Sequence, residues 1–127
     1  MDAYLSVEAH RLLTALTLIP SRQSGEGLII GHQIGSRYFV ERVYLLPHLF
    51  NFLPQKFFEL DDTFKNKLIG FWGYNLSPRK IDKILAPFAC GKLFLELNFK
   101  NPAKLRIKSF LIEYKDKFFL SPINLRL

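Results

Sequence analysis

The residues best suited to metal or nucleophile chemistry are few in this chain and lie far apart. Three histidines (His10, His32 and His48) and one cysteine, Cys90, supply all the imidazole and thiol groups among 127 residues. Zinc sites and cysteine–histidine catalytic pairs both need such groups side by side. No two of them have ligand spacing, so we expect ordinary histidines and a small buried cysteine. A nucleophilic pair of Cys90 with His32 or His48 is the alternative that folding would have to create.

Carboxylates offer a second place to look for chemistry. An atypical hydrolytic centre would combine Glu26 and Asp82 with His32 and Asn75, if the fold brought these groups together. A phosphate-binding loop is not indicated, because the Gly25–Gly27 segment is too short and lacks the lysine that such loops carry.

Two apolar segments, Gly27–His32 and Leu68–Asn75, resemble two hallmark strands of the JAMM/MPN (JAB-like, Mov34) domain family. In catalytic members of that family the second strand runs into His-x-His-Pro, and a Ser and an Asp follow. Alternate residues of a strand point the same way, so His-x-His presents both imidazoles to one zinc ion. This chain has Gly73 and Asn75 at the two histidine positions and Leu76 in place of the proline. The resemblance therefore implies the scaffold without the zinc-binding motif.

The other catalytic positions of the family are also altered. Asp82 would match the aspartate ligand, but it follows Asn75 by seven residues where the family has eleven, so we expect a solvated carboxylate in a first helical turn. The family's glutamate base precedes the first strand's glycine by three residues, which gives Ser24, while Glu26 is two positions off that register. Glu26 is expected to be a loop charge. The resemblance thus implies no metal, no cofactor and no catalytic residue: a pseudoenzyme.

Composition favours one domain spanning residues 1–127. Hydrophobic residues make up 49% of the chain, which suffices for one core, and thirteen phenylalanines predict that this core is aromatic. The alternative is that some of these rings form a surface for a partner. One cysteine excludes an internal disulfide and fits a reducing cytoplasm. No secretion signal or membrane-spanning segment is apparent, so we expect a cytoplasmic protein without a membrane role.

The formal net charge is +7, and two groups of cations stand out. The first group alternates with apolar residues on a predicted strand and the second decorates a predicted helix: Lys104, Arg106 and Lys108, then Arg79, Lys80 and Lys83. Together they would make a polyanion site, for nucleic acid in particular. The alternatives are a solvated face or a charged edge strand, which we favour, and a surface for an acidic protein partner.

Periodicity predicts an α/β (α+β) order of elements. The first helix spans Tyr4–Ile19, and a later helix begins after Ser77 as N-cap with Pro78 in its first turn and continues to Ala86. A third helix is expected over Leu53–Lys65. The predicted strands are Gly27–His32, Tyr38–Leu46, Lys67–Trp72, Lys92–Phe99, Lys104–Tyr114 and Lys117–Leu120. The resemblance implies a central mixed or antiparallel sheet flanked by helices, with the layering of cytidine deaminases.

Metal-free members of the family serve as scaffolds that pair with another copy or with a catalytic relative. We therefore expect a non-catalytic JAMM/MPN-like interaction module that forms a homo- or heterodimer through apolar surface of the Phe-rich region, residues 48–67. The alternatives are a small basic nucleic-acid-binding protein and, as the least favoured, a hydrolase with an atypical centre.

Overall fold

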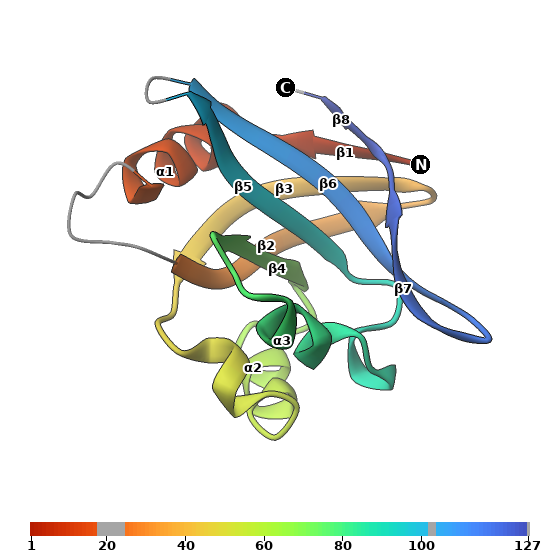
Figure 1. The fold of residues 1–127 in the computed structure, drawn as a ribbon. Coiled ribbons are helices and arrows are strands. Elements are labelled where there is room, and N and C mark those ends of the chain that lie inside the picture. The colour runs from red at the N-terminus through yellow and green to blue at the C-terminus, as the bar shows by residue number, and fades with distance from the viewer. Residues whose placement is uncertain (18–24, 102–103, 127) are drawn as a thin grey trace.

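Among the described residues, eight strands form one mixed sheet that bends until it nearly closes on itself (Figure 1). The computed structural model describes residues 1–17, 25–101 and 104–126. Neighbouring strands follow the order β7-β6-β5-β4-β2-β3-β1-β8. Their bounds are β1 (Asp2–Leu5), β2 (Gly25–Ile34), β3 (Arg37–Leu45), β4 (Leu68–Tyr74), β5 (Leu93–Asn101), β6 (Lys104–Lys115), β7 (Lys117–Pro122) and β8 (Asn124–Arg126). The fold is α+β, with more strand and less helix than the sequence predicts.

Both parallel and antiparallel pairs occur in the sheet. β1 runs parallel to β3 and β8, and β4 runs parallel to β5, whereas the remaining neighbours are antiparallel. The parallel pair β4–β5 requires a crossover, which the segment 75–92 supplies with its short helices.

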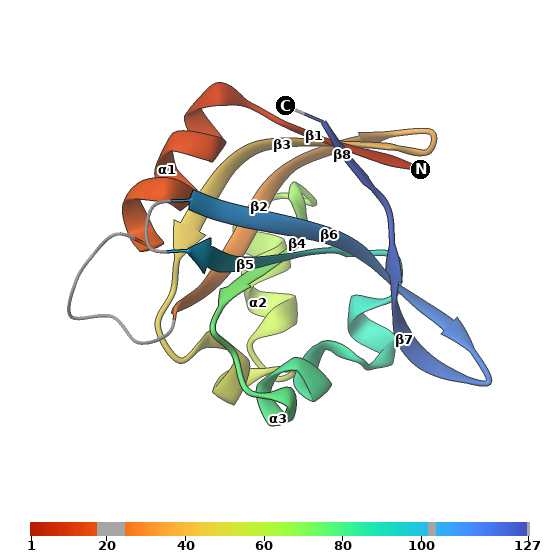
Figure 2. The same ribbon diagram turned by 45° about the horizontal axis from the view of Figure 1, so that its top comes forward.

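The chain itself joins the two ends of the strand order at Ile123, between β7 and β8. The Ile123 N–H donates to Ser109 O at 3.0 Å, and Ser109 Oγ donates to Ile123 O at 2.8 Å. At this point the chain leaves its partner β6 and begins to pair with β1. The crossing curls the sheet almost into a barrel (Figure 2).

A β-bulge reverses the faces of β3. Arg42 lies opposite Ile30 while Val40 lies opposite Gly31, so Glu41 is an extra residue with no partner on β2. The bulge lies in the middle of the strand, and every residue beyond it changes side.

This bulge makes the predicted alternation in β3 wrong. The sequence predicts Phe39, Val43 and Leu45 on one face, whereas the structure buries Tyr38 and Val40 before the bulge together with Val43 after it. A strict two-residue alternation predicts the wrong buried face here, because the one inserted residue moves all later side chains of the strand to the other face of the sheet.

Six short helices flank the sheet in the described residues. They are α1 (Val7–Thr17), the 3-10 helix η1 (Leu49–Phe52), α2 (Phe57–Thr63), α3 (Pro78–Ile81), and the 3-10 helices η2 (Asp82–Ile84) and η3 (Pro87–Ala89). α1 covers one face, and the other helices gather on the opposite face (Figures 1 and 2). None of them is long and apolar enough to cross a membrane.

The predicted helices are shorter in the structure than in the sequence reading. Tyr4 belongs to β1, α1 begins after Ser6, whose Oγ accepts the Ala9 N–H at 3.0 Å, and Ile19 lies outside the described residues. The helix expected over Leu53–Lys65 is only α2. The Ser77 cap is confirmed, since its side chain accepts the Lys80 N–H at 3.4 Å.

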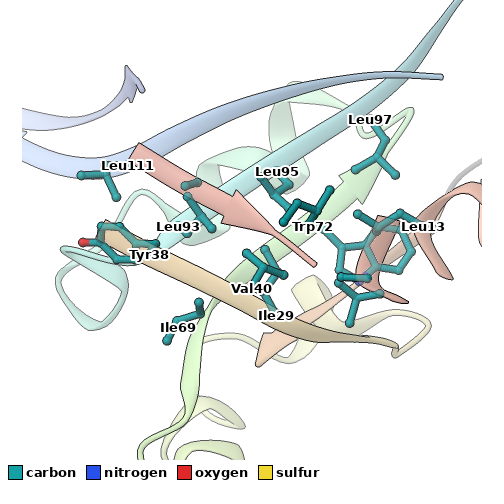
Figure 3. Close-up of a cluster of buried hydrophobic side chains, with 14 residues drawn as sticks. Leu13, Ile29, Tyr38, Val40, Ile69, Trp72, Leu93, Leu95, Leu97 and Leu111 are labelled. Atoms are coloured by element: carbon teal, nitrogen blue, oxygen red, sulfur yellow. The ribbon is translucent and has the colours of Figure 1, made fainter. Parts of the chain in front are cut away.

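The core consists of two apolar clusters, one on each face of the sheet. The first contains α1 and the inward side chains of β1 to β6, with Trp72 and three leucines of β5 at its centre (Figure 3). The second lies under η1, α2, α3, η2 and η3 and is rich in phenylalanine, with Phe50 packed edge-on against Phe71 at 6.0 Å and Phe57 against Phe88 at 5.0 Å. Most of the aromatic core predicted from composition is in this second cluster.

Tyr38 closes one side of the first cluster. Its hydroxyl donates to Gly91 O at 2.8 Å. Burial raises the pKa of Tyr38 above its ordinary value, and the nearby Glu113 carboxylate raises it further.

Close strand contact at Gly27 depends on a missing side chain. A Cβ there would overlap Tyr44 O and lie 2.9 Å from Trp72 Cε2. The indole Nε1–H of Trp72 also donates to Tyr44 O, at 3.1 Å. Gly27 therefore lets β3 and the largest core side chain approach each other across β2.

We predict that Gly27→Ala lowers the free energy of unfolding by about 2–4 kcal/mol, because it overpacks the core and disturbs the indole hydrogen bond. Urea unfolding followed by Trp72 fluorescence measures this change. Gly35→Ala is the control: Gly35 has φ +60° but no atom within 4 Å of its missing Cβ, so only about 1 kcal/mol of backbone strain is expected. Equal costs for the two variants would contradict the close contact.

Candidate functional site

The residues singled out by sequence meet where β2 begins and β4 ends. In the register of these antiparallel strands Glu26 lies opposite Gly73, and Gly25 lies opposite Tyr74. Glu26 is only 3% exposed. The prediction of a loop charge is therefore wrong: β2 starts two residues earlier than predicted and places this carboxylate beside Gly73. Ser24, the position that the family register gives for the base, lies outside the described residues.

Both oxygens of the Glu26 carboxylate are bound. Lys80 Nζ donates to Oε1 at 2.7 Å, and the backbone N–H of Phe50 donates to Oε2 at 2.6 Å. The side chain of Lys80 is 30% exposed, so the ammonium enters the site from its rim. Lys80 was grouped with the solvent-facing cations of α3, and the structure removes it from that group.

Local structure explains how Lys80 reaches Glu26. Ser77 caps α3, and Pro78 occupies the first turn, where its missing N–H would have no partner. Three residues after the cap, Lys80 ends one helical turn with its side chain directed at the start of β2. The capped turn therefore fixes the ammonium relative to the sheet.

The side chain of Leu76 fills the space beside Gly73. A Cβ at position 73 would overlap Leu76 Cδ1 and lie 2.7 Å from Leu76 Cγ. No larger side chain fits at Gly73 unless Leu76 moves. Asn75 is exposed and has φ 55°, a left-handed conformation that asparagine tolerates.

Asp82 is exposed and lies at the junction of α3 and η2, in the first turn of η2. The ion pairs among the described residues do not include Asp82. Asp82 therefore has the solvated position that the sequence predicts.

The zinc set of the catalytic family does not fit the residues present. Gly73 has no donor atom and no room for one, and the cation beside Glu26 is the Lys80 ammonium. Within the described ranges, no three His, Cys, Asp or Glu side chains form a group that would hold a metal ion.

The histidine-based alternatives are not assembled. His32 lies six residues from Glu26 on the same strand, which separates them by about 20 Å. His32 instead contacts Glu41 through Nδ1 at 2.9 Å and stacks on Phe39 at 4.9 Å. The hydrolytic centre of Glu26, His32, Asn75 and Asp82 is therefore contradicted.

Cys90 is exposed, so the prediction of a buried cysteine is wrong. It follows the single turn of η3 at a bend of the chain rather than inside the core. No hydrogen bond joins it to His32 or His48 in the part of the chain that the structure describes, and His48 is exposed with φ 63°. His10 is half-buried on α1.

The remaining cations are exposed as the strand and helix patterns predict. Arg106 and Lys108 alternate with Leu105 and Ile107, which pack against the first cluster. Arg79 and Lys83 are exposed at α3 and η2. The side chain of Lys104 lies outside the described residues.

A depression of about 260 Å³ lies between α3 and β5, next to the Glu26–Lys80 pair. Its lining combines apolar side chains with two amides and one carboxylate: Gly73, Asn75, Leu76, Ile81, Phe94, Glu96, Leu97 and Asn98.

Comparisons with known proteins give information about the fold alone. No family model matches the chain, and no curated protein matches it. The chain is similar to the solution structure of protein DSY2949 from Desulfitobacterium hafniense, with a TM-score of 0.60 and 23% identity over 99% of this chain and 93% of that one. A likeness at this identity concerns the arrangement of the backbone and carries no function.

The sequence reading missed the Glu26–Lys80 pair and the Phe50 N–H that completes it. The two residues of this ion pair are 54 positions apart, so their contact produces no periodic pattern in the sequence. Two local signals were available. The segment Gly25–Gly27 contains no turn residue other than glycine, so the apolar strand could have been extended through it. Lys80 follows the Ser77 cap by three residues, which places it in the first helical turn.

We predict that Lys80→Met lowers the free energy of unfolding by about 2–3 kcal/mol, because the buried carboxylate loses its counter-ion. Glu26→Gln should cost only about 1 kcal/mol, since an amide oxygen still accepts from Phe50 and the ammonium turns to solvent. Urea unfolding measures both, and the double variant should be more stable than Lys80→Met alone.

Lys83→Met is the matched control, because Lys83 is exposed on the next turn and makes no ion pair within the described ranges. We expect it to change stability by less than about 0.5 kcal/mol. If Lys80→Met costs no more than Lys83→Met, the ion pair does not stabilise the site.

Proposed function

We propose that this chain is a non-catalytic interaction module whose layering is of the JAMM/MPN kind, cytidine-deaminase-like, and whose metal position is taken by a lysine. The observation that carries the proposal is the contact of Lys80 Nζ with Glu26 Oε1 at 2.7 Å. The position of Glu26 opposite Gly73 supports the assignment, because it sets a carboxylate two residues from the expected base position, Ser24, across from the first ligand position of the family pattern.

The chemistry of the pair explains why such a site would be inert. A hydrolytic zinc ion keeps an open coordination position for the water it activates, and an ammonium has none. A general base also needs a free oxygen for the proton it takes, whereas both oxygens of Glu26 already accept hydrogen bonds. In this proposal the pair occupies the site and removes its reactivity.

Apolar surface in residues 48–67 supports the interaction role. Phe52 on η1 is 58% exposed, and Phe58 on α2 is 70% exposed. A depression of about 410 Å³ adjoins Phe52 and is also lined by Asn51, Gln55, Lys56 and Glu59. Exposed phenylalanines beside a hollow are typical of protein contacts. We propose that this surface, which we call the Phe52–Phe58 surface, contacts a second copy of the chain.

We predict that the purified protein holds zinc far below one ion per chain and does not hydrolyse an isopeptide-linked substrate, with or without added zinc. Elemental mass spectrometry and a fluorescent isopeptide assay measure these two quantities. Stoichiometric zinc together with hydrolysis that Glu26→Gln abolishes would overturn the proposal, because it would show a working base at this position.

We predict that the protein is a dimer by light scattering and that Phe52→Ser combined with Phe58→Ser weakens the dimer more than about 100-fold. Removing two apolar rings from an interface costs about 1.5–3 kcal/mol each. Ile34→Ser is the matched control, because Ile34 is 62% exposed at the far end of β2.

The control should leave the dimer unchanged. A monomer at all concentrations, or equal weakening by the control, would show that the Phe52–Phe58 surface does not join two copies. A heterodimeric partner would then be the occupant to look for on that surface.

A further inference from the structure

A depression of about 500 Å³ lies at one end of the first apolar cluster, and its volume is within the range of small-molecule pockets. Tyr38 of β3 and Leu111 of β6 belong to the first cluster and also line this depression, which we call the Tyr38 pocket. Figure 3 shows these two side chains at one end of the cluster and Leu13 of α1 at the other. The Tyr38 pocket therefore lies at the end of the interior face that α1 does not cover.

The strand register turns Glu113 toward the Tyr38 pocket. β6 pairs with β7 without a bulge, so its side chains alternate between the two faces. Leu111 is in the first cluster and Ile112 in the second, which puts Glu113 on the side of Leu111. Phe119 lies directly opposite Glu113 on β7, and directly opposed side chains share a face. Leu111, Glu113 and Phe119 all line the pocket.

The Glu113 carboxylate is half-buried and has no counter-ion within the described ranges, since their ion pairs do not include it. It lies near enough to Tyr38 for its charge to raise the pKa of that hydroxyl, in addition to the effect of burial. A negative charge partly withdrawn from water and placed beside apolar side chains favours a cation as its neighbour.

The other polar atoms at this place are also acceptors. The Tyr38 hydroxyl donates its hydrogen to Gly91 O at 2.8 Å, so its oxygen is left to accept. Gly91 contributes a carbonyl, and both residues line the pocket. A carboxylate, a hydroxyl oxygen and a carbonyl next to Leu111 and Phe119 call for a ligand that brings hydrogen-bond donors, a positive charge and an apolar body.

Lys115 is the positively charged side chain among the lining residues. It lies two residues beyond Glu113, about 7 Å along the strand, and pairs with Lys117 in the last pair of the hairpin. It is exposed, so water and salt screen its charge. A divalent metal ion fits less well than an organic cation, because Glu113 is the sole carboxylate in the lining and Ca²⁺ or Mg²⁺ takes about six oxygen ligands.

We propose that the Tyr38 pocket binds a small protonated amine, whose ammonium contacts Glu113 and the Tyr38 hydroxyl oxygen and whose apolar body packs on Leu111 and Phe119. This inference goes beyond the proposed function, because an interaction module requires no small ligand, and neither proposal rests on the other.

The test is a nuclear magnetic resonance titration of the isotope-labelled full chain at neutral pH with 2-phenylethylamine. We expect its largest amide shift changes at Gly91, Leu111 and Glu113. The neutral analogue 2-phenylethanol has a nearly equal shape and should bind at least about fivefold more weakly, because a charge-assisted hydrogen bond is lost. The anionic analogue 3-phenylpropanoate should bind at least as weakly as the alcohol.

Glu113→Gln should weaken binding of the amine at least about fivefold and binding of the alcohol less than about twofold, since it removes the charge and keeps the shape. The matched control is Asp116→Asn, which removes the same charge at the exposed β6–β7 tip, where asparagine tolerates the φ of 65°. The control should change the affinity for the amine less than about twofold. Phe119→Ala should weaken binding of both ligands at least about threefold, because both lose apolar contact.

Four outcomes would overturn the proposal. They are amide shifts confined to other parts of the chain, equal affinity for the amine and the alcohol, equal weakening by Glu113→Gln and Asp116→Asn, and tighter binding of 3-phenylpropanoate. The last would assign the pocket to an anion held by Lys115. None of these outcomes alters the zinc, hydrolysis and light-scattering results, so failure here is distinguishable from failure of the proposed function.

Discussion

A buried carboxylate with a tethered counter-ion governs the arrangement around the start of β2. Glu26 is almost inaccessible to water, and a charged group in that position requires compensation from its surroundings. Lys80 supplies an opposite charge from α3, and the Phe50 N–H supplies a hydrogen bond from η1. Because the donors come from separate segments, one carboxylate holds three parts of the chain together. They are the start of β2, the capped turn of α3 and the start of the Phe-rich region.

The curved sheet makes this arrangement possible. β2 and β4 are central strands, buried on both faces, and glycines let their neighbours approach closely: Gly27 admits Trp72 and β3, and Gly73 admits Leu76. A side chain at Gly73 would displace Leu76, which packs on the second cluster. The missing side chain at Gly73 and the position of Leu76 therefore depend on each other, because an empty pocket of that size in the core would destabilise the fold.

Apolar alternation was sufficient to predict the central strands, and the Ser77-Pro78 pair was sufficient to predict the start of α3. The strands β1 and β8, which lie side by side at one end of the strand order, were missed, since each is short and pairs only with residues distant in sequence. Glu41 shows a different limit: a single bulged residue reversed the faces of β3. The ion pair at Glu26 shows a third, because charge pairing across the sheet depends on a register that sequence periodicity does not reveal.

The crossing at Ile123 has a consequence for how the chain is made. β1 is made long before β8, yet one of its edges is covered only by β8, and Asp2 receives the side-chain hydrogen bond of Asn124 from 122 residues away. Until β8 emerges, β1 presents unpaired N–H and C=O groups along that edge, the kind of template on which nascent chains associate wrongly. Closing so long a loop is slow compared with local helix formation. Nascent chains halted before Asn124 should therefore be the species that chaperones retain.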